Sequence, residues 1–361
     1  MKKVVIGMSG GVDSSVAALL LKQAGYEVIG LFMHNWEEEE NGQCTSAQDW
    51  QDVMGVCGKL DIPCYSVNFA KEYMDRVFSY FLDEYKKGRT PNPDVLCNRE
   101  IKFGPFASYA MAMGADYVAT GHYCDIHHGE DGHFLLTAKD DNKDQTYFLN
   151  QVRESQLKNV LFPLGNMDKS EVRKIAQDYD LVTAKKKDST GICFIGERKF
   201  REFLSAYLPG QKGKIVDVSG KEIGEHFGLM YYTLGQRKGL GIGGIKGEDA
   251  NRWYVVDKDL ENNRLVVSCG EGEELFSSAC VCSGMNIIGK WEETEFDATA
   301  KFRYRQGEQK VHVRLCEDKA EITFYERQRA VTPGQYAVIY VDYDGSKRRC
   351  LGGGVIDKVI F

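Results

Sequence analysis

The N-terminal stretch Lys3-Val4-Val5-Ile6-Gly7-Met8-Ser9-Gly10-Gly11-Val12-Asp13-Ser14 decides the fold of this chain. Lys3–Met8 is an apolar run typical of a buried strand, and the residues after Gly11 have the apolar spacing of a helix. Gly25 stands where a helix commonly ends. A strand, a glycine-rich turn and a helix in this order predict the first unit of a parallel α/β sheet.

The following residues continue this alternation of strand and helix. Strands are predicted at Glu27–Met33, Cys64–Asn68 and Asp116–Thr120, and helices near 45–60, 71–87, 101–113, 153–159 and 168–180. A hairpin is predicted around Gly129–Gly132, and the acidic stretch Glu37–Glu40 is interpreted as a solvated lid. We therefore expect a Rossmann-like parallel sheet within residues 1–205.

From about residue 210 the pattern changes to short strands separated by glycine-rich turns. A hairpin is predicted at Arg252–Asp257 and Arg264–Ser268, and a turn at Thr332-Pro333-Gly334. Further strands are predicted at Phe296–Tyr304, Gln309–Cys316, Ala320–Tyr325 and Tyr336–Val341. We expect a central mostly-β domain at 206–275 and a C-terminal antiparallel β-barrel at 276–361, so the fold class is α/β with two β modules.

Composition limits the class of protein. The 361 residues are 43% hydrophobic and 27% charged, which is ordinary globular usage. No run approaches the ~18 apolar residues of a membrane span, and the apolar start is too short for a signal peptide, so we expect a soluble cytoplasmic protein without membrane contact. The 11 cysteines are odd in number and irregularly spaced, which argues against a disulfide framework or structural zinc.

The net charge of −7 argues against indiscriminate nucleic-acid binding but allows a local basic patch. Residues 301–314 contain five cations and one acid, Glu308. Arg303-Tyr304-Arg305 is expected on a strand, where it could combine phosphate contacts with base stacking or simply form a solvated barrel face. The loop Gly235–Gly244 has the same two interpretations, a clamp on RNA or a plain connection.

The turn Ser9–Ser14 has the composition of a phosphate-binding loop. Its glycines allow close approach of the backbone, and the helix that follows offers unpaired N–H groups and the positive end of its dipole. Asp13 could hold Mg²⁺ on the phosphates. The loop is neither a P-loop nor a dinucleotide-binding fingerprint, and it resembles the loop of enzymes that split ATP into AMP and pyrophosphate. Gly121, directly after the predicted strand Asp116–Thr120, is expected to lie against the nucleotide or to be a structural turn glycine.

Two cysteine segments add a second kind of chemistry. Asn92-Pro93-Asp94-Val95-Leu96-Cys97-Asn98 is expected as a loop before a helix whose dipole favours the Cys97 thiolate, or as a loop with a buried cysteine. Asp94 is placed to act as an acid or base. Asp188–Gly196 is expected as a mobile loop that carries Cys193, with Lys185–Lys187 beside it, or as a charge run before a buried strand.

Together these motifs resemble the tRNA-specific 2-thiouridylases. The matching stretches are Met8–Ser15, Arg89–Phe103, Ala119–Tyr123, Lys143–Leu149, Asp188–Gly196, Tyr232–Gly244, Trp253–Leu265, Lys301–Gln306 and Thr332–Gln335. They cover nearly the whole chain in order. The resemblance implies an ATP-pyrophosphatase domain of the adenine-nucleotide alpha-hydrolase type and an ATP-dependent sulfurtransferase that acts on the wobble uridine of tRNA.

The resemblance also implies roles for individual residues. ATP would be held by Gly7, Met8, Ser9, Gly10, Gly11, Val12, Asp13, Ser14, Met33 and Gly121, with Mg²⁺ at Asp13. The target base would meet Asn92, Pro93 and Asp94, with His122 near it. Cys193 would carry a persulfide from a sulfur-donor protein, a cysteine desulfurase or a relay protein, and Cys97 would attack or resolve it through a transient disulfide. The tRNA would contact Lys143, Asp144, Gln145, Arg303, Tyr304 and Gln335.

Other readings stay open on the sequence alone. Another ATP-pyrophosphatase, such as an amidating or lysidine-forming enzyme, would use an amine as nucleophile and would not need Cys97 or Cys193. A non-catalytic RNA-binding or nucleotide-sensing protein would not need Asp13 and Asp94. Cys97, Cys193 and Asp94 could also ligate an iron–sulfur cluster with one open position.

Overall fold

The N-terminal part of the chain forms a five-stranded sheet in which every neighbouring pair of strands is parallel. The computed structural model describes residues 1–36, 45–188, 200–242 and 252–361. The sheet has the order β3-β2-β1-β4-β7, with β1 (Lys3–Met8), β2 (Glu27–His34), β3 (Cys64–Asn68), β4 (Tyr117–Ala119) and β7 (Val160–Leu161). The predicted strands and the α/β fold class are therefore confirmed.

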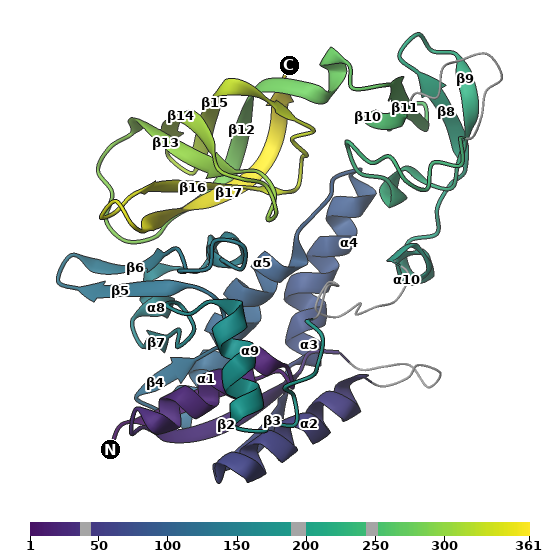
Figure 1. Ribbon diagram of the computed structural model, residues 1–361. Helices are drawn as coiled ribbons and strands as arrows, with labels where there is room; N and C mark the ends of the chain where they lie inside the picture. Colours follow the sequence, from purple (N-terminus) through teal and green to yellow (C-terminus); the bar gives the residue numbers. More distant parts are fainter. Residues whose placement is uncertain (37–44, 189–199, 243–251) are drawn as a thin grey trace.

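Alternate residues of β1 bury opposite faces of this sheet. Val4 and Ile6 pack with helices on one face, and Val5 packs with helices on the other. The first face is covered by α1 (Val12–Gln23), α2 (Thr45–Leu60) and α9 (Lys169–Asp178). The second is covered by α3 (Ala70–Tyr73), η1 (Met74–Phe78), α4 (Ser79–Lys86), α5 (Pro93–Cys97), η2 (Asn98–Phe106) and α6 (Ala107–Ala112). Figure 1 shows the sheet between these two sets of helices.

The chain passes from one half of the sheet to the other after β3. Strands β2 and β3 lie on one side of β1, and β4 and β7 lie on the other. In open parallel sheets the carboxyl ends of the two strands at such a reversal form the binding crevice. The residues that follow β1 and β4 are therefore the first place to look for a site.

The helix that follows α4 begins earlier than predicted. Asn92 is its N-cap and Pro93 its first residue, so the segment 92–98, expected as a loop, is instead the start of a helix. The backbone continues from α5 into the π-helical segment η2 without a break. Such segments carry one extra residue per turn and are found most often at functional sites.

The central module contains a four-stranded sheet of order β10-β11-β8-β9. Its strands are β8 (Gly213–Asp217), β9 (Glu222–His226), β10 (Trp253–Asp259) and β11 (Arg264–Cys269), and the short helices α10 (Phe200–Tyr207), η3 (Leu229–Tyr231) and η4 (Glu273–Leu275) flank the sheet along the chain. The predicted hairpin between β10 and β11 is confirmed, with Asn263 in the left-handed region at φ 51°.

The C-terminal module is a closed six-stranded antiparallel barrel, as predicted. Its strands are β12 (Phe276–Ile287), β13 (Glu295–Lys301), β14 (Gln309–Cys316), β15 (Lys319–Arg329), β16 (Tyr336–Asp342) and β17 (Arg348–Ile360). Pairing of β12 with β17 closes the barrel. Strand β17 lies outside the predicted strands, because its three central glycines resemble a turn. They are needed there, since a Cβ at Gly352 would lie 1.9 Å from the carbonyl oxygen of Asn286.

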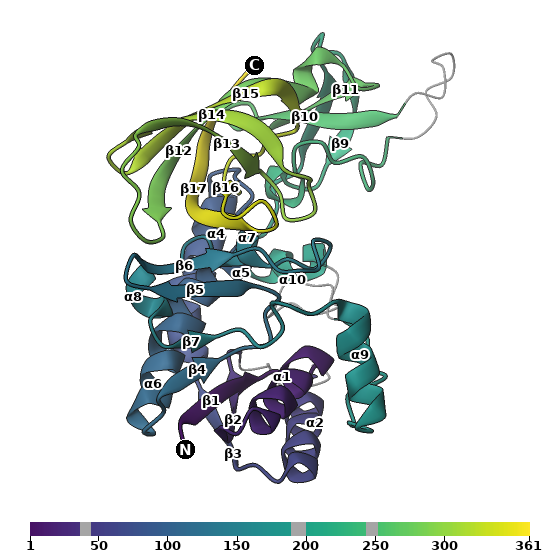
Figure 2. The same cartoon turned by 60° about the vertical axis from the view of Figure 1, so that its left-hand side comes forward.

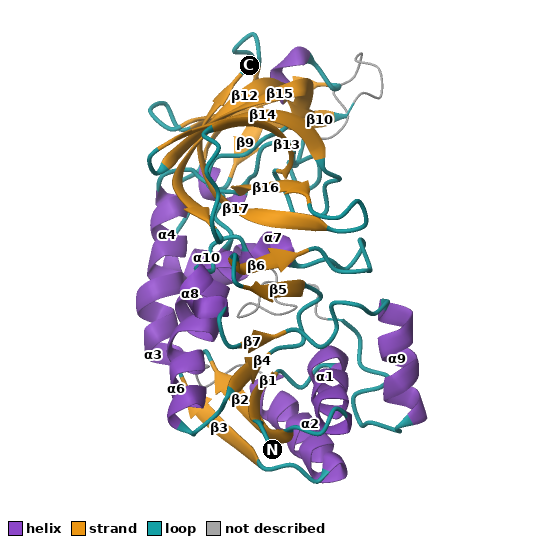
Figure 3. Ribbon diagram, turned by 90° about the vertical axis from the view of Figure 1, so that its left-hand side faces the viewer, coloured by secondary structure: helices purple, strands orange, loops and turns teal. Residues whose placement is uncertain are grey.

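A hairpin from the N-terminal module extends the barrel sheet. The predicted hairpin around 129–132 is formed by β5 (Asp125–Gly129) and β6 (Gly132–Leu136), and β6 pairs with β17. Two short helices, α7 (Thr146–Leu149) and α8 (Glu154–Leu157), follow the hairpin. The hairpin lies between the parallel sheet and the barrel in Figures 2 and 3. None of the helices in the described parts of the chain has the length and apolar character needed to cross a bilayer.

Candidate active site

The loop between β1 and α1 is shaped by its own hydroxyl groups. The Ser9 amide donates to Ser14 Oγ at 3.2 Å, and Ser14 Oγ donates to the Gly11 carbonyl at 3.2 Å. Gly10 has a φ of +73°, and a Cβ there would lie 2.7 Å from the Asp49 carbonyl oxygen. Gly11 is the N-cap of α1, and no side chain caps the helix. The first amides of α1 are therefore available to an anion, as a phosphate-binding loop requires.

Gly121 brings the end of β4 into contact with this loop. A Cβ at Gly121 would lie 2.7 Å from the Ser14 amide nitrogen and 2.9 Å from the Asp13 carbonyl carbon. Both neighbours are backbone atoms that cannot rotate away. Gly121 is thus required because two chain segments approach closely at this position. This contact gives a physical reason for the alternative that Gly121 is a structural turn glycine.

Asp13 is the centre of a cluster of charged groups. Its carboxylate accepts from Lys169 Nζ at 2.6 and 2.8 Å, and from the Tyr123 hydroxyl at 2.8 Å. Burial, followed by the charge of Asp13, raises the pKa of Tyr123, so the phenol stays protonated and can donate. The same ammonium lies 2.9 Å from Asp188 Oδ1. Lys169 therefore joins the loop after β1 to the residue that directly precedes 189–199.

Asp188 is held by three cations. Lys143 Nζ lies 2.9 Å from Oδ2, and Arg173 Nη2 lies 2.6 Å from Oδ1, beside Lys169. Burial raises the pKa of Asp188, but the bonds from Lys143 and Lys169 outweigh it and hold the pKa below its usual value. Lys186, from the predicted basic run, pairs instead with Asp49 and Asp52 of α2. The edge of the site is therefore rich in cations that already have partners.

Whether Asp13 can bind Mg²⁺ depends on its ion pair with Lys169. The described residues contain no group of three or more side chains that could hold a metal ion by themselves. Mg²⁺ on a nucleotide usually needs only one or two carboxylates, because phosphates and water supply the other ligands. The side chain of Asp13 is 32% exposed, so it can supply one such ligand if Lys169 turns to Asp188. The residues fit Mg²⁺ in this limited sense.

The segment expected to contact the target base, Asn92–Asp94, lies at the start of α5. The side chain of Asn92 accepts from the amides of Asp94 and Val95 at 3.2 and 3.4 Å. Pro93 occupies the first helical turn, where a missing N–H costs nothing. This N-cap fixes the backbone position from which the Asp94 side chain extends. Cys97, the last residue of α5, is 1% exposed.

The segment η2, which follows Cys97, lies against the end of β1. A Cβ at Gly7 would lie 3.3 Å from the ring of Phe106, which is the last residue of η2. The ring of Phe103 lies 6.3 Å from that of His122, which follows β4. The ends of β1 and β4 are therefore brought together with the helical segment that follows Cys97. Cys193, its partner in the expected chemistry, lies outside the described residues, as do the stretch 37–40 and the residues that follow Ile242 in the loop 235–244.

His122 is set up as a neutral imidazole. Its Nδ1 is 2.8 Å from Thr120 Oγ1, and rings of Phe103 and Phe162 flank it. Burial, and then the charge of Lys102, lower the pKa of His122 well below its usual value. At neutral pH the ring is therefore uncharged. Met33, at the end of β2, is half-buried beside the core on the same face as Cys97.

The three residues expected to touch tRNA after β6 differ in exposure. Lys143 is partly exposed, with 38% of its side chain accessible. Gln145 is the N-cap of α7 and is also partly exposed, and its Oε1 accepts from the Tyr123 amide at 2.9 Å. Asp144 is buried, and its carboxylate accepts from the Ala138 amide and the Thr146 hydroxyl at 3.0 and 2.6 Å. In this conformation Asp144 shapes the turn that presents its neighbours.

The barrel residues expected to touch tRNA lie in turns. Arg303 and Tyr304 follow β13 and are not on a strand, which corrects the sequence expectation; the strand ends at Lys301. Nη2 of Arg303 donates to the carbonyls of Leu234 and Ala330 and to the Thr332 hydroxyl, at 2.9, 2.6 and 2.8 Å. That guanidinium therefore connects the barrel to the central module.

Tyr304 and Gln335 face the N-terminal module. The ring of Tyr304 lies 4.3 Å from that of Phe148, and the Gln335 side chain donates to the Thr90 carbonyl at 2.7 Å. Both are partly buried. These two contacts place barrel residues beside the elements that bear Gln145 and Asn92.

The sequence did not indicate the roles of three site residues: the contacts of Tyr123 and Lys169 with Asp13, and the binding of cations by Asp188. Lys169 lies 156 positions from Asp13, and only the fold brings them together. The one local signal was Asp168, which caps α9 together with Glu171 and so fixes the first helical turn that holds Lys169.

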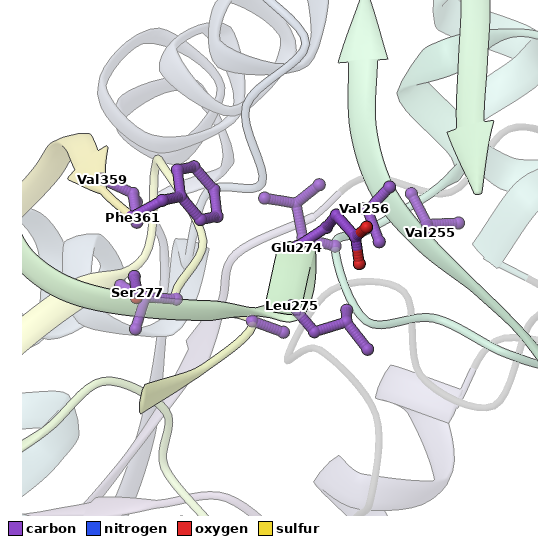
Figure 4. A pocket seen from close by; sticks show the side chains of 10 residues that line it. Val255, Val256, Glu274, Leu275, Ser277, Val359 and Phe361 are labelled. Carbon is purple, nitrogen blue, oxygen red and sulfur yellow. The ribbon is translucent and has the colours of Figure 1, made fainter. Parts of the chain in front are cut away.

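A separate apolar hollow lies between the central module and the barrel. Figure 4 shows Val255 and Val256 of β10 on one side and Val359 and Phe361 on the other, with Leu275 between them. None of its lining residues belongs to the elements that form the nucleotide loop. We assign this hollow to the packing of the two modules.

The chain matches three protein-family models. A family model described as the tRNA methyl transferase HUP domain matches residues 2–197. Models described as the tRNA methyl transferase PRC-barrel domain and the aminomethyltransferase beta-barrel domain match residues 201–269 and 277–356. The match therefore extends over all three modules.

Individual relatives are similar over the same length. The chain is 58% identical over 360 residues to the tRNA-specific 2-thiouridylase MnmA of Streptococcus thermophilus, which covers 99% of this chain and 95% of that protein. The enzyme of the same name from Streptococcus pyogenes is 58% identical over 361 residues, covering 98% and 95%. A solved structure, the U34-tRNA thiolase NcsA from Methanococcus maripaludis, is 20% identical with a TM-score of 0.36 over 57% of this chain and 64% of that one. That likeness is too low to carry an argument.

Proposed function

Because this chain belongs to the family of tRNA-specific 2-thiouridylases, we propose that it replaces the C2 oxygen of the wobble uridine of tRNA with sulfur at the expense of ATP. The chain is accordingly a tRNA sulfurtransferase. One observation supports the proposal most strongly: at one edge of the sheet Gly121 lies against the loop after β1, and η2, which follows Cys97, lies beside Gly7 of β1 and His122 after β4.

The chemistry needs ATP because the C2 carbonyl of uridine has no leaving group. Transfer of AMP to O2, with release of pyrophosphate, converts that oxygen into a good leaving group. The amides at the start of α1 are suited to hold the phosphates, and Asp94 is suited to move the proton of the base. Mg²⁺, held in part by Asp13, would neutralise phosphate charge.

The sulfur step then uses two cysteines. The terminal sulfur of a persulfide on Cys193 adds to C2, and the bond between C2 and the AMP oxygen breaks with its electron pair. The Cys97 thiolate next attacks the Cys193 sulfur, which releases the thiocarbonyl of 2-thiouridine and leaves a Cys97–Cys193 disulfide. A thiol reductant then regenerates both thiols. The neutral His122 would serve as a hydrogen-bonding group beside the base.

The base must leave its stack to reach this site. Enzymes that act on a base extrude it into a pocket, and the cost is lowest in single-stranded regions such as an anticodon loop. We propose that Asn92, Pro93 and Asp94 contact the extruded base. Contacts to the rest of the tRNA are proposed for Lys143, Gln145, Arg303, Tyr304 and Gln335, with Asp144 supporting the first two.

The remaining proposals concern partners and organisation. ATP contacts are proposed for residues 7–14, Met33 and Gly121. The persulfide would come from a cysteine desulfurase or a relay protein, in the cytoplasm where tRNA is processed. We propose domain boundaries at 1–205, 206–275 and 276–361, which the limits of the three matching family models support to within a few residues.

Nucleoside mass spectrometry tests the function. The purified enzyme, given tRNA, ATP and a persulfide donor, is expected to form 2-thiouridine and to release AMP and pyrophosphate only when tRNA is present. Formation of a methylated nucleoside in place of a thiolated one would refute the proposal. Cys193→Ser is expected to abolish thiolation while ATP binding persists, and Cys269→Ser, at an exposed cysteine of β11, is the matched control. Full activity of Cys193→Ser would refute the persulfide role.

A further inference from the structure

The segment Gly88–Thr90, called here the junction segment, lies where all three modules meet. It follows the end of α4 and precedes Asn92, the cap of the helix that carries Asp94 and Cys97. Gly88 has a φ of +73°, so the chain turns sharply as it leaves α4. The path of these three residues fixes where the base-contacting segment begins.

The barrel holds the junction segment through four hydrogen bonds. Arg89 Nη2 lies 2.9 Å from Asp357 Oδ1 and 3.1 Å from the Ile356 carbonyl oxygen. The Thr90 amide donates to the Pro333 carbonyl at 3.0 Å, and the Thr90 carbonyl accepts from Gln335 at 2.7 Å. Both backbone groups of Thr90 are thus used by the barrel.

The central module holds the same segment from another direction. Lys258 Nζ, on β10, donates to the Gly88 carbonyl at 2.8 Å. The side chain of Leu260 lies so close that a Cβ on Gly88 would be 2.7 Å from its Cδ2. The hydroxyls of Thr90 and Thr233 are 3.4 Å apart.

The N-terminal module supplies a buried anchor. Arg89 Nε lies 2.7 Å from Glu84 Oε2, and the side chain of Glu84 is only 5% exposed. Separating a buried ion pair is costly, because the remaining charge is left without a partner. Arg89 therefore cannot move independently of α4, and its free side reaches Asp357 on the barrel.

We propose that the junction segment positions the base-contacting residues 92–94, and that Lys258 and Asp357 are positioning residues through which the central module and the barrel set that position. The inference rests on the proposed function. Neither residue touches substrate in this arrangement; each acts through the backbone or side chain of residues 88–89. The two β modules thereby align the catalytic segment with an RNA that spans all three modules.

The test uses the full chain with Lys258→Met and Asp357→Asn, separately. Both replacements remove the charge; Asp357→Asn keeps the length of the side chain, and Lys258→Met keeps its apolar stem without the terminal nitrogen. Asp342→Asn, at an exposed carboxylate of β16, is the matched control, and Asp357→Glu is the conservative variant. The assays are kcat and KM for tRNA-dependent pyrophosphate release, and the fluorescence of an anticodon stem-loop that carries 2-aminopurine in place of the target base, which brightens when the base is extruded.

The expected result is a loss of about tenfold in kcat for both variants, since displacement of a catalytic group by 1 Å can cost up to about a hundredfold. The KM for ATP should stay within about twofold, the 2-aminopurine signal should fall, and Asp357→Glu should recover much of both. A merely structural role would lower the amount of folded enzyme and leave the kcat of the folded fraction and the fluorescence signal unchanged.

The inference would be overturned if Lys258→Met and Asp357→Asn both had the kcat and the fluorescence of the wild type, as is expected of the control Asp342→Asn. The proposed function would still stand. Asp357 is about one-third exposed, so its isosteric change decides the matter even if Lys258→Met fails to fold. Absence of thiolation in the wild-type enzyme would refute the proposed function itself, which is a separate outcome.

Discussion

The replacement Gly121→Ala adds one methyl group where the structure has no room for it. The new Cβ would lie 2.7 Å from the Ser14 amide nitrogen, whereas ordinary contacts begin at 3.4 Å. The two segments must therefore separate by roughly 0.7 Å, the difference of these two distances. The atoms involved are backbone atoms of the nucleotide loop, so no side-chain rotation relieves the contact.

The expected size of the effect follows from this displacement. Overpacking of this kind costs about 1–3 kcal/mol. If half of that strain is released by moving the start of α1 away from the phosphates, the dissociation constant for ATP rises by a factor of about 2 to 12, because each 1.4 kcal/mol is a factor of ten. Stability and ATP affinity should therefore fall together.

Isothermal titration with ATP and a urea unfolding series measure both quantities. Gly58→Ala is the matched control, because Gly58 is exposed on α2 and a Cβ there would meet nothing within 4 Å. Alanine in a helix is favoured over glycine by about 1 kcal/mol, so this variant should be as stable as the wild type or slightly more stable. ATP affinity and stability of Gly121→Ala equal to those of Gly58→Ala would refute the reasoning.

Three further predictions follow from the site. Lys169→Met should lower stability by about 2 kcal/mol in urea unfolding, because two one-third-exposed carboxylates lose their shared cation; an unchanged unfolding midpoint would contradict this. The pKa of His122 in the folded protein is below its usual value of 6.5, so the contribution of His122 to stability is constant above pH 6.5 and is lost as the pH falls further. Protonation of His122 should therefore cause no change in kcat near pH 6.5. An NMR titration of the ring with a midpoint near 6.5 would disprove this. Arg303→Lys should loosen the barrel from the central module and raise its hydrogen exchange, because the shorter lysine side chain does not bring its nitrogen to the position from which Nη2 donates to all three acceptors; unchanged exchange would count against that role.

The nucleotide loop and the sheet were predictable because their signals are local. Glycines and hydroxyl residues between an apolar strand and a helix have few other uses, and the structure places Ser9 and Ser14 within one hydrogen-bonded turn. Much of the barrel was predictable for the same reason, since buried and exposed residues alternate along strands such as β14 and β15. The start of α5 was misjudged although Asn92 and Pro93 form a standard helix start, because a proline between two polar residues resembles a turn just as well.

The junction of the three modules could not be read from the sequence. Gly88 meets Lys258 across 170 positions, and Arg89 meets Asp357 across 268. No local sequence pattern indicates such pairs, and each of these residue types is common at ordinary surface positions. The ion cluster around Asp13 and Lys169 has the same origin. Long-range electrostatic pairs appear only once the fold has placed their partners.

Mapping of disulfides after a single turnover tests the central claim most directly. The enzyme, carrying one persulfide on Cys193, is mixed with tRNA and ATP without reductant, alkylated and digested for mass spectrometry. We expect one Cys97–Cys193 disulfide for every 2-thiouridine formed, with neither product when ATP is omitted. Formation of 2-thiouridine while Cys97 remains fully alkylated as a thiol would contradict it.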